Sequence, residues 1–131
     1  MELSHASFLP GPSDTARGSV SFTWAQDGAF LMMRSMGDLR SSLPAAVMTI
    51  GRDDGRPDYT VLYYDFRSVS RVYAMSFADG VWKMWRDAPG FWQRFEGAIN
   101  KDGKTIAAHW DKSSDGATWE HDFDLTYRKV N

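Results

Sequence analysis

The chain of 131 residues contains no cysteine, which excludes disulfide bonds and metal sites built from thiolates. Its three histidines form no His-x-x-x-His or His-x-His pair, and no acidic loop has the calcium-binding pattern, so we predict no metal site. Phosphate-cradling glycine loops and the Gly-x-Ser-x-Gly motif of hydrolases are also missing. Sequence motifs therefore assign no catalytic residue.

Strong charge bias and long apolar runs are missing too. The net charge of −2 gives little attraction to nucleic acid or to an anionic membrane. No apolar run approaches the roughly 20 residues of a membrane helix, and Met1–His5 lacks the basic and apolar regions of a secretory signal. We expect a soluble cytoplasmic protein with a single domain, residues 1–131, and neither a nucleic-acid nor a membrane partner.

Turn signals and aromatic residues are plentiful instead. Asp-Gly supplies the positive φ angles of tight hairpin turns. Five such pairs occur, at Asp27-Gly28, Asp54-Gly55, Asp79-Gly80, Asp102-Gly103 and Asp115-Gly116. Aromatic residues make up 15% of the chain, enough to fill a sizeable core. The repeated turns predict an up-and-down antiparallel sheet.

Ten strands are expected between these turns. They cover 2–9, 18–25, 30–36, 46–51, 59–65, 69–78, 81–86, 91–99, 105–112 and 119–129. Helix is limited to about one turn within Asp38–Ala46, because Pro44 interrupts it. A sheet of this length removes its exposed edges by closing, so we predict an all-β, single antiparallel up-and-down barrel of about ten strands. A two-sheet sandwich is the competing architecture.

The hairpins also predict which side chains face inward. A two-residue turn at Asp79-Gly80 places three pairs on the inner face, namely Phe77 with Trp82, Met75 with Met84, and Tyr73 with Arg86. The next two hairpins place Phe95 opposite Trp110 and Trp110 opposite His121. Glu96, His109 and Asp122 then align on the outer face, and His5 is expected to be solvated.

The two ends of the predicted barrel differ in their connections. Alternate turns lie at the same end, so four Asp-Gly turns gather at one end, which we expect to be closed. Longer connections gather at the other end, which we expect to be the mouth. Arg34, Arg71 and Arg86 are placed at strand ends facing this mouth, and Arg17, Arg40 and Arg67 in its loops.

Candidate ligand-binding residues follow from this arrangement. Arg71 and Arg86 could hold a carboxylate, phosphate or enolate, with Tyr73 or Tyr64 donating a hydrogen bond; alternatively, both arginines reach into solvent. Six apolar side chains either line a pocket or simply fill the barrel: Trp24, Met75, Trp82, Met84, Phe95 and Trp110. An inward His121 is a haem ligand, a proton shuttle or a core residue.

Several short motifs occur in a recognisable order. They are Gly28-Ala29-Phe30-Leu31, Tyr63-Tyr64-Asp65, the run Gly80–Phe91, Gln93-Arg94-Phe95 with Gly97, and Asp115-Gly116 followed by Trp119-Glu120 and Asp122–Tyr127. Over about residues 18–130, the chain resembles an uncharacterised bacterial family of lipocalin-like (calycin) β-barrel proteins. The resemblance implies a small barrel with an internal cavity and brings no established reaction.

Two related groups of calycins differ from this chain. The nitrobindins, which bind haem, open with a Gly-x-Trp-x-Gly-x-Gly segment that is missing here, and His121 is the nearest match to their late-strand histidine. Fatty-acid-binding proteins use Arg-x-Tyr on the last strand, where this chain reads Thr126-Tyr127-Arg128. Their helical lid is also missing. The first strand begins almost at Met1, which leaves incomplete closure or pairing with a partner as alternatives.

Three hypotheses for function remain. The first is binding of a small hydrophobic or amphipathic, anionic molecule inside the barrel. The second is an enzyme of the calycin class, either haem-based or an acid–base isomerase or cyclase. The third is a ligand-free structural or interaction module, in which outward-facing Trp85 and Trp92 mark a partner surface, for example of a homodimer.

Overall fold

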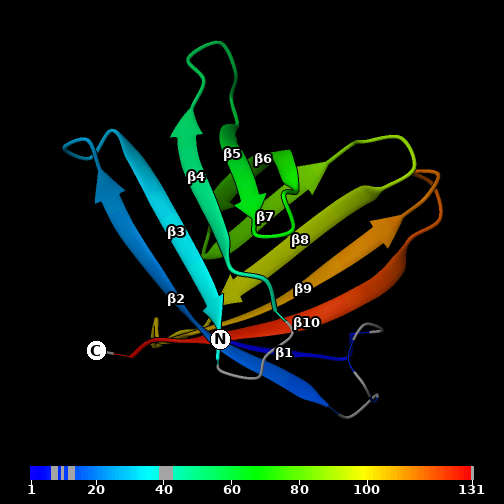
Figure 1. Cartoon of the computed structure of the whole chain (residues 1–131). Helices are drawn as coiled ribbons and strands as arrows, with labels where there is room; N and C mark the ends of the chain where they lie inside the picture. The colour runs from blue at the N-terminus through cyan, green and yellow to red at the C-terminus, as the bar shows by residue number, and fades with distance from the viewer. Residues whose placement is uncertain (7–8, 10, 12–13, 39–42, 131) are drawn as a thin grey trace.

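The computed structural model describes residues 1–6, 9, 11, 14–38 and 43–130 of the chain. Ten strands form one closed antiparallel barrel in the order β1-β10-β9-β8-β7-β6-β5-β4-β3-β2 (Figure 1). The strands are β1 (Glu2–Ser4), β2 (Thr15–Ala25), β3 (Phe30–Gly37), β4 (Ala46–Arg52), β5 (Tyr59–Asp65), β6 (Ser70–Ala78), β7 (Val81–Arg86), β8 (Trp92–Ile99), β9 (Thr105–Ser113) and β10 (Glu120–Arg128). The predicted all-β, up-and-down barrel is confirmed, and it is consistent with a calycin-like fold.

Strand boundaries agree with the sequence prediction to within a few residues, except for the first strand. That strand ends at Ser4, because His5 adopts a positive φ of 55° and turns the chain away. Within the range of the predicted helical turn, residues 39–42 including Arg40 lie outside the described residues, and 43–45 have no regular structure. In the described ranges, no helix is long and apolar enough to cross a membrane.

All five Asp-Gly pairs lie in connections between consecutive strands. Asp79 and Gly80, with φ angles of 54° and 74°, form the two-residue turn that was predicted between β6 and β7. Phe77 therefore pairs with Trp82 and Met75 with Met84, as expected. Across β8 and β9, Phe95 pairs with Trp110. The sequence therefore predicted the register of these four strands correctly, although the predicted pair of Tyr73 with Arg86 does not form.

The predicted register between β9 and β10 is wrong. Trp110 pairs with Phe123, and His121 pairs with Asp111 on the outer face. The cause is a β-bulge between His121 and Phe123, which inserts one extra residue and reverses the side to which the preceding residues point. The inward positions of Phe123, Leu125 and Tyr127 are as predicted, since they follow the bulge.

The two ends of the barrel carry different kinds of connection. The Asp-Gly end carries the turns 26–29, 53–58, 79–80 and 100–104, and the loop end carries 5–14, 38–45, 66–69, 87–91 and 114–119. Ala6 and Leu9, in the first long connection, belong to the buried core, so these two residues cover part of the loop end. At the Asp-Gly end, inner-face positions such as Trp24 remain exposed.

The expectation that the Asp-Gly end is closed is therefore wrong. Tight turns stop at the strand tips and carry no residues that could cross the opening, whereas longer loops can bring apolar side chains back over the core. The structure places the more open rim at the Asp-Gly end and the more covered rim at the loop end.

The closing strand β1 spans only part of the gap between β2 and β10. Its three residues pair with Thr15–Arg17 on one side and Asp124–Thr126 on the other. Within the described part of the chain, β2 beyond Gly18 is paired with β3 alone. The β2–β3 hairpin extends toward the upper left of Figure 1, away from the red end of β10. The barrel is thus closed near the loop end, and its seam is unpaired toward the Asp-Gly end.

Candidate functional site

The Asp-Gly end exposes a group of large apolar side chains that lie on the inner face of the sheet. Phe22, Trp24, Tyr59 and Phe77 are 45%, 70%, 40% and 52% exposed. Their inward placement follows from register, because Phe22 pairs with buried Met33, and Phe77 with buried Trp82. We call these four residues the open mouth.

Trp82 forms the floor of this open mouth. Its ring lies edge-on to Phe22 at a centroid distance of 6.2 Å, and at 6.2 Å from the ring of Tyr127. The side chain is buried, and its indole Nε1 has no hydrogen-bond partner in the described part of the chain. An unpaired buried N–H is costly, which makes this atom a candidate donor to a bound molecule.

Glycine at position 97 makes room for the side chains of Phe95 and Ile106. Gly97 pairs directly with Trp82 across β7 and β8. A Cβ at this position would meet the Ile106 side chain at 3.1 Å and the Phe95 ring at 3.2 Å. The space beside the backbone of β8 is therefore already taken by the aromatic core.

Below the open mouth, the barrel is packed with side chains. Trp82 contacts Phe95 at a centroid distance of 4.6 Å, and Phe95 contacts Trp110 at 5.1 Å. Met84 and Val61 are among the most deeply buried residues. Of the residues predicted to line or fill the barrel, Met75, Trp82, Met84, Phe95 and Trp110 are buried core residues, whereas Trp24 belongs to the open mouth.

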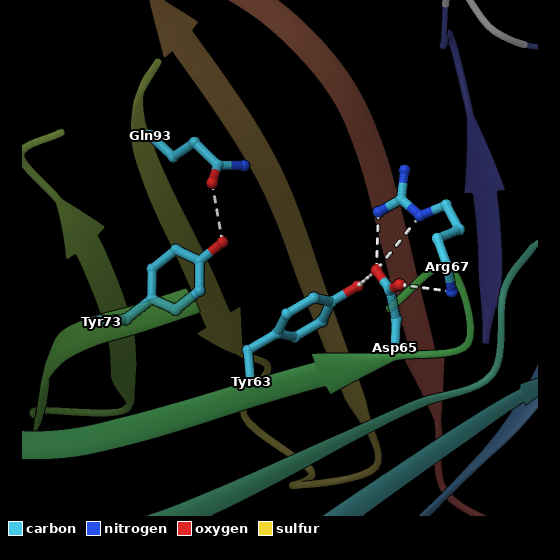
Figure 2. A network of polar contacts seen from close by, with 5 residues as sticks. All are labelled: Tyr63, Asp65, Arg67, Tyr73 and Gln93. Carbon is cyan, nitrogen blue, oxygen red and sulfur yellow. Dashed lines mark hydrogen bonds and ion pairs between the residues drawn. The ribbon is translucent and has the colours of Figure 1, made fainter. Parts of the chain in front are cut away.

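A network of polar side chains occupies the interior near the loop end (Figure 2). The hydroxyl of Tyr63 donates to the Asp65 carboxylate at 2.7 Å, and the Arg67 guanidinium reaches the same oxygen at 2.6 Å. The backbone N–H of Arg67 donates to the other oxygen at 2.9 Å. Hydrogen bonds with Arg67 hold the pKa of the buried Asp65 carboxyl far below its usual range, although burial opposes this effect.

Tyr73 and Gln93 form a second polar pair in this interior. The Tyr73 hydroxyl donates to the Gln93 side-chain oxygen at 2.7 Å, and both residues are buried. Burial raises the pKa of Tyr73, while the positive charges of Arg71 and Arg86 oppose the rise. Both guanidinium groups therefore lie close enough to influence this hydroxyl.

Arg71 is held between aromatic rings. Its guanidinium carbon lies 5.2 Å from the ring centre of Phe91 and 5.9 Å from that of Tyr63. Among the described residues, neither Arg71 nor Arg86 has a carboxylate within ion-pair distance, whereas Arg67 is paired with Asp65. Arg71 and Arg86 are thus two cations at the loop end that have no acidic partner among the described residues.

Three predicted site residues lie away from both groups. Arg34 pairs with Ser21 and Val47 on the outer face of β3, and it is exposed. Tyr64 is 53% exposed on the outer face of β5, because the inward tyrosine of this strand is its neighbour Tyr63. His121 lies outside because of the bulge. The haem hypothesis therefore loses the interior histidine on which it depended.

The three histidines instead meet two aspartates on the outer face. His121 lies 3.7 Å from Asp111 and 3.5 Å from Asp124. His109 lies 3.6 Å from Asp111, and His5 is hydrogen-bonded to Asp124 at 2.7 Å. His109 pairs with Asp124 rather than Asp122 across the strands, whereas His5 is exposed to solvent, as predicted, and also contacts Asp124. No group of three such side chains in the described ranges has a geometry that could hold a metal ion.

Sequence reasoning missed the polar network and the histidine cluster for different reasons. Tyr63, Asp65 and Arg67 follow each other at alternate positions, a period-two signal that could have identified them. The contact between His5 and Asp124 joins the two ends of the chain and leaves no local signal. Trp85 and Trp92, expected to mark a partner surface, are half-buried, and Gly116 lies against the ring of Trp92.

Comparison with known proteins adds no assignment. A scan against protein-family models found no match, and a search of curated proteins found no similar sequence. The geometry of the barrel is therefore the only basis for a functional proposal.

Proposed function

We propose that this protein binds a small, uncharged hydrophobic molecule at the open mouth, as a binding protein of calycin type. The observation that carries the proposal is the exposure of Phe22, Trp24, Tyr59 and Phe77 on the inner face of the barrel. Inner-face aromatic side chains are normally buried, and exposed apolar groups that line a concave rim favour ligand binding. Arg71 and Arg86, which motivated an anionic ligand, lie at the opposite end, and Arg52, the cross-strand partner of Tyr59, is exposed to solvent, so we assign this mouth no charge preference.

The hydrogen-bond donors at the floor of the open mouth indicate the chemical class of the ligand. The unpaired Nε1–H of Trp82 favours a ligand with a hydrogen-bond acceptor, such as a carbonyl or ether oxygen. Burial raises the pKa of Tyr127, so its hydroxyl stays protonated and is a second available donor. An apolar body with one acceptor group is thus the ligand class that fits best.

The experiment uses the uncharged fluorescent probe N-phenyl-1-naphthylamine. We expect its fluorescence to rise on binding, and Phe77→Ser and Trp24→Ser to weaken binding because they remove apolar contact area. Phe66→Ser is the matched control, since Phe66 is 83% exposed in a turn at the loop end. Equal binding by the wild type and both mouth variants would contradict the proposal, as would an equal loss in Phe66→Ser.

A second pair of ligands tests the role of the Trp82 N–H. Naphthalene and 2-acetonaphthone share an apolar ring system, but only the latter carries a carbonyl acceptor. We expect Trp82→Phe to weaken binding of 2-acetonaphthone about fivefold, which corresponds to one ordinary hydrogen bond. Binding of naphthalene should change much less. Equal losses for both ligands would show that the N–H makes no specific contribution.

A further inference from the structure

A notch separates β6 and β7 at the loop end of the barrel. The paired register of these two strands ends at Ala74 and Trp85, although β6 continues back to Ser70 and β7 continues to Arg86. The next cross-strand position would pair Tyr73 with Arg86, and this pair is missing. The strands thus part before the rim, on the far side of the packed core from the open mouth.

The notch combines two kinds of lining. A depression of about 400 Å³ lies here; Leu62, Tyr64 and Val72 line it from the outer face of the sheet, and Arg71 and Arg86, which belong to the inner face, line it where the two strands part. The three apolar side chains are 38%, 53% and 60% exposed, so they cover a sizeable part of the outer surface. Leu62 and Val72 are direct cross-strand partners, which makes this apolar wall continuous over β5 and β6.

The charge at the notch is unbalanced. Arg71 and Arg86 are half-buried, and neither forms an ion pair with a described carboxylate. Asp87 also lines the depression, but it is exposed to solvent and forms no ion pair with either arginine. Stacking of Arg71 near Phe91 and Tyr63 limits the freedom of its guanidinium, which lowers the entropic cost of binding an anion.

From this juxtaposition, we propose that the β6–β7 notch is a second binding site, specific for a small carboxylate with an apolar body. The carboxylate would enter the gap between the two strands and lie against the guanidinium groups of Arg71 and Arg86, which match it in charge and in hydrogen-bond geometry. The apolar body would cover Leu62 and Val72. This site is independent of the open mouth and lies at the opposite end of the barrel.

Titration calorimetry with benzoate tests the site, with acetate and inorganic phosphate as comparison probes. We expect benzoate to bind most tightly, because only it can use both the cations and the apolar wall. Arg86→Gln should weaken benzoate binding about tenfold, the loss of one charge-assisted contact. Arg34→Gln is the matched control, since Arg34 is an exposed arginine on the outer face of β3. Unchanged binding by Arg86→Gln, or an equal loss in Arg34→Gln, would overturn the proposal.

Two further measurements locate the site. Benzoate should shift the backbone amide resonances of Val72 and Asp87, and Val72→Ser should weaken benzoate binding but leave acetate binding unchanged. Shifts confined to the open mouth would overturn the proposal. Saturating N-phenyl-1-naphthylamine should leave the affinity for benzoate unchanged, because the two sites are separate. Competition between the probes would assign benzoate to the open mouth and would also overturn the second site.

Discussion

Single residues of the polar network hold the loop end of the barrel together. Asp65 has a side chain with 0% exposure and accepts hydrogen bonds from Tyr63 and Arg67. A buried carboxylate of this kind is tolerated only because it is fully paired. Tyr63 and Asp65 belong to β5, and Arg67 belongs to the turn that follows. The hydrogen bonds among these three residues therefore anchor that turn to the sheet.

Asp65→Asn should therefore lower the free energy of unfolding by about 2 kcal/mol, the value of hydrogen bonds to a charged group. Urea denaturation at neutral pH measures this loss. Asp79→Asn is the control, because Asp79 lies in the β6–β7 turn and asparagine tolerates its positive φ of 54°. A similar loss in both variants would contradict a special role for Asp65.

The same carboxylate predicts an acid dependence of stability. Its pKa is lower in the folded protein than in the unfolded chain, so the stabilisation is present above the unfolded pKa of about 4 and is lost as the pH falls below it. We expect the free energy of unfolding to decrease from pH 5 to pH 2 more steeply in the wild type than in Asp65→Asn. Parallel curves for the two proteins would exclude this contribution.

Gly18 is a residue at which the backbone leaves no space. A Cβ there would overlap the main-chain carbonyl oxygen of Met36 on β3, and a backbone atom cannot move aside cheaply. Gly18→Ala should lower the free energy of unfolding by about 1 to 3 kcal/mol, as overpacking does. Gly51→Ala is the control, since nothing lies within 4 Å of its added Cβ. Thermal denaturation of both variants provides the comparison, and equal melting temperatures would contradict the prediction.

At the scale of single elements, β2 is both a barrel strand and an unpaired edge. The N–H of Gly18 donates to the Met1 carbonyl oxygen at 3.1 Å, on the side of β1. Backbone N–H groups alternate between the two sides of a strand, so those of Val20, Phe22 and Trp24 point to the same side, where β1 has ended. Neighbouring Ser21 and Thr23 point toward β3.

Amide hydrogen exchange should therefore alternate along β2. We expect the amides of Val20, Phe22 and Trp24 to exchange about tenfold or more faster than those of Ser21 and Thr23, because only the latter face a paired strand. Nuclear magnetic resonance resolves these amides individually, and the alternation provides its own control. Uniform protection along β2 would mean that another strand covers this edge in solution.

The β-bulge in β10 shows how one element changes the assignment of a site. Turn residues predicted well where the strands begin and end, and the alternation of side chains predicted their faces. The extra residue between His121 and Phe123 carries no turn signal, so the bulge was not predicted. The preceding side chains therefore changed faces without any visible mark in the sequence. This single feature moved His121 from the expected interior to the outer histidine cluster.

At the scale of the whole molecule, barrel closure depends on three residues of β1. Leu3 is 3% exposed and lies between Ala16 of β2 and Leu125 of β10. Its side chain thus contacts both β2 and β10, two strands at opposite ends of the chain. Contacts of this kind close the barrel near the loop end.

Leu3→Ala should lower the free energy of unfolding by about 2 to 5 kcal/mol, the usual cost of truncating a buried leucine. Val130→Ala is the control, because Val130 is 86% exposed near the other end of the chain. Urea denaturation monitored by tryptophan fluorescence measures both variants. If the two variants have the same stability, β1 does not contribute to closure as the structure indicates.

The sequence by itself determined the strands and most of their pairing. Asp-Gly turns and period-two patterns are local signals, so they predicted ten strands, the barrel, and the inner positions of Trp82, Phe95 and Trp110. Arg71 and Arg86 were also placed at the loop end correctly, because they lie at the ends of β6 and β7 that are remote from the Asp79-Gly80 turn.

Only the tertiary structure decided which end is open and which residues meet there. Loop coverage depends on how Ala6 and Leu9 fold back over the core, and the unpaired seam depends on where β1 ends. Both features depend on contacts between segments that are far apart in the chain. The entropy lost and the burial energy gained in such contacts cannot be predicted from a local sequence pattern. The turns therefore located the two ends of the barrel, and packing alone separated an apolar mouth at one end from a cationic notch at the other.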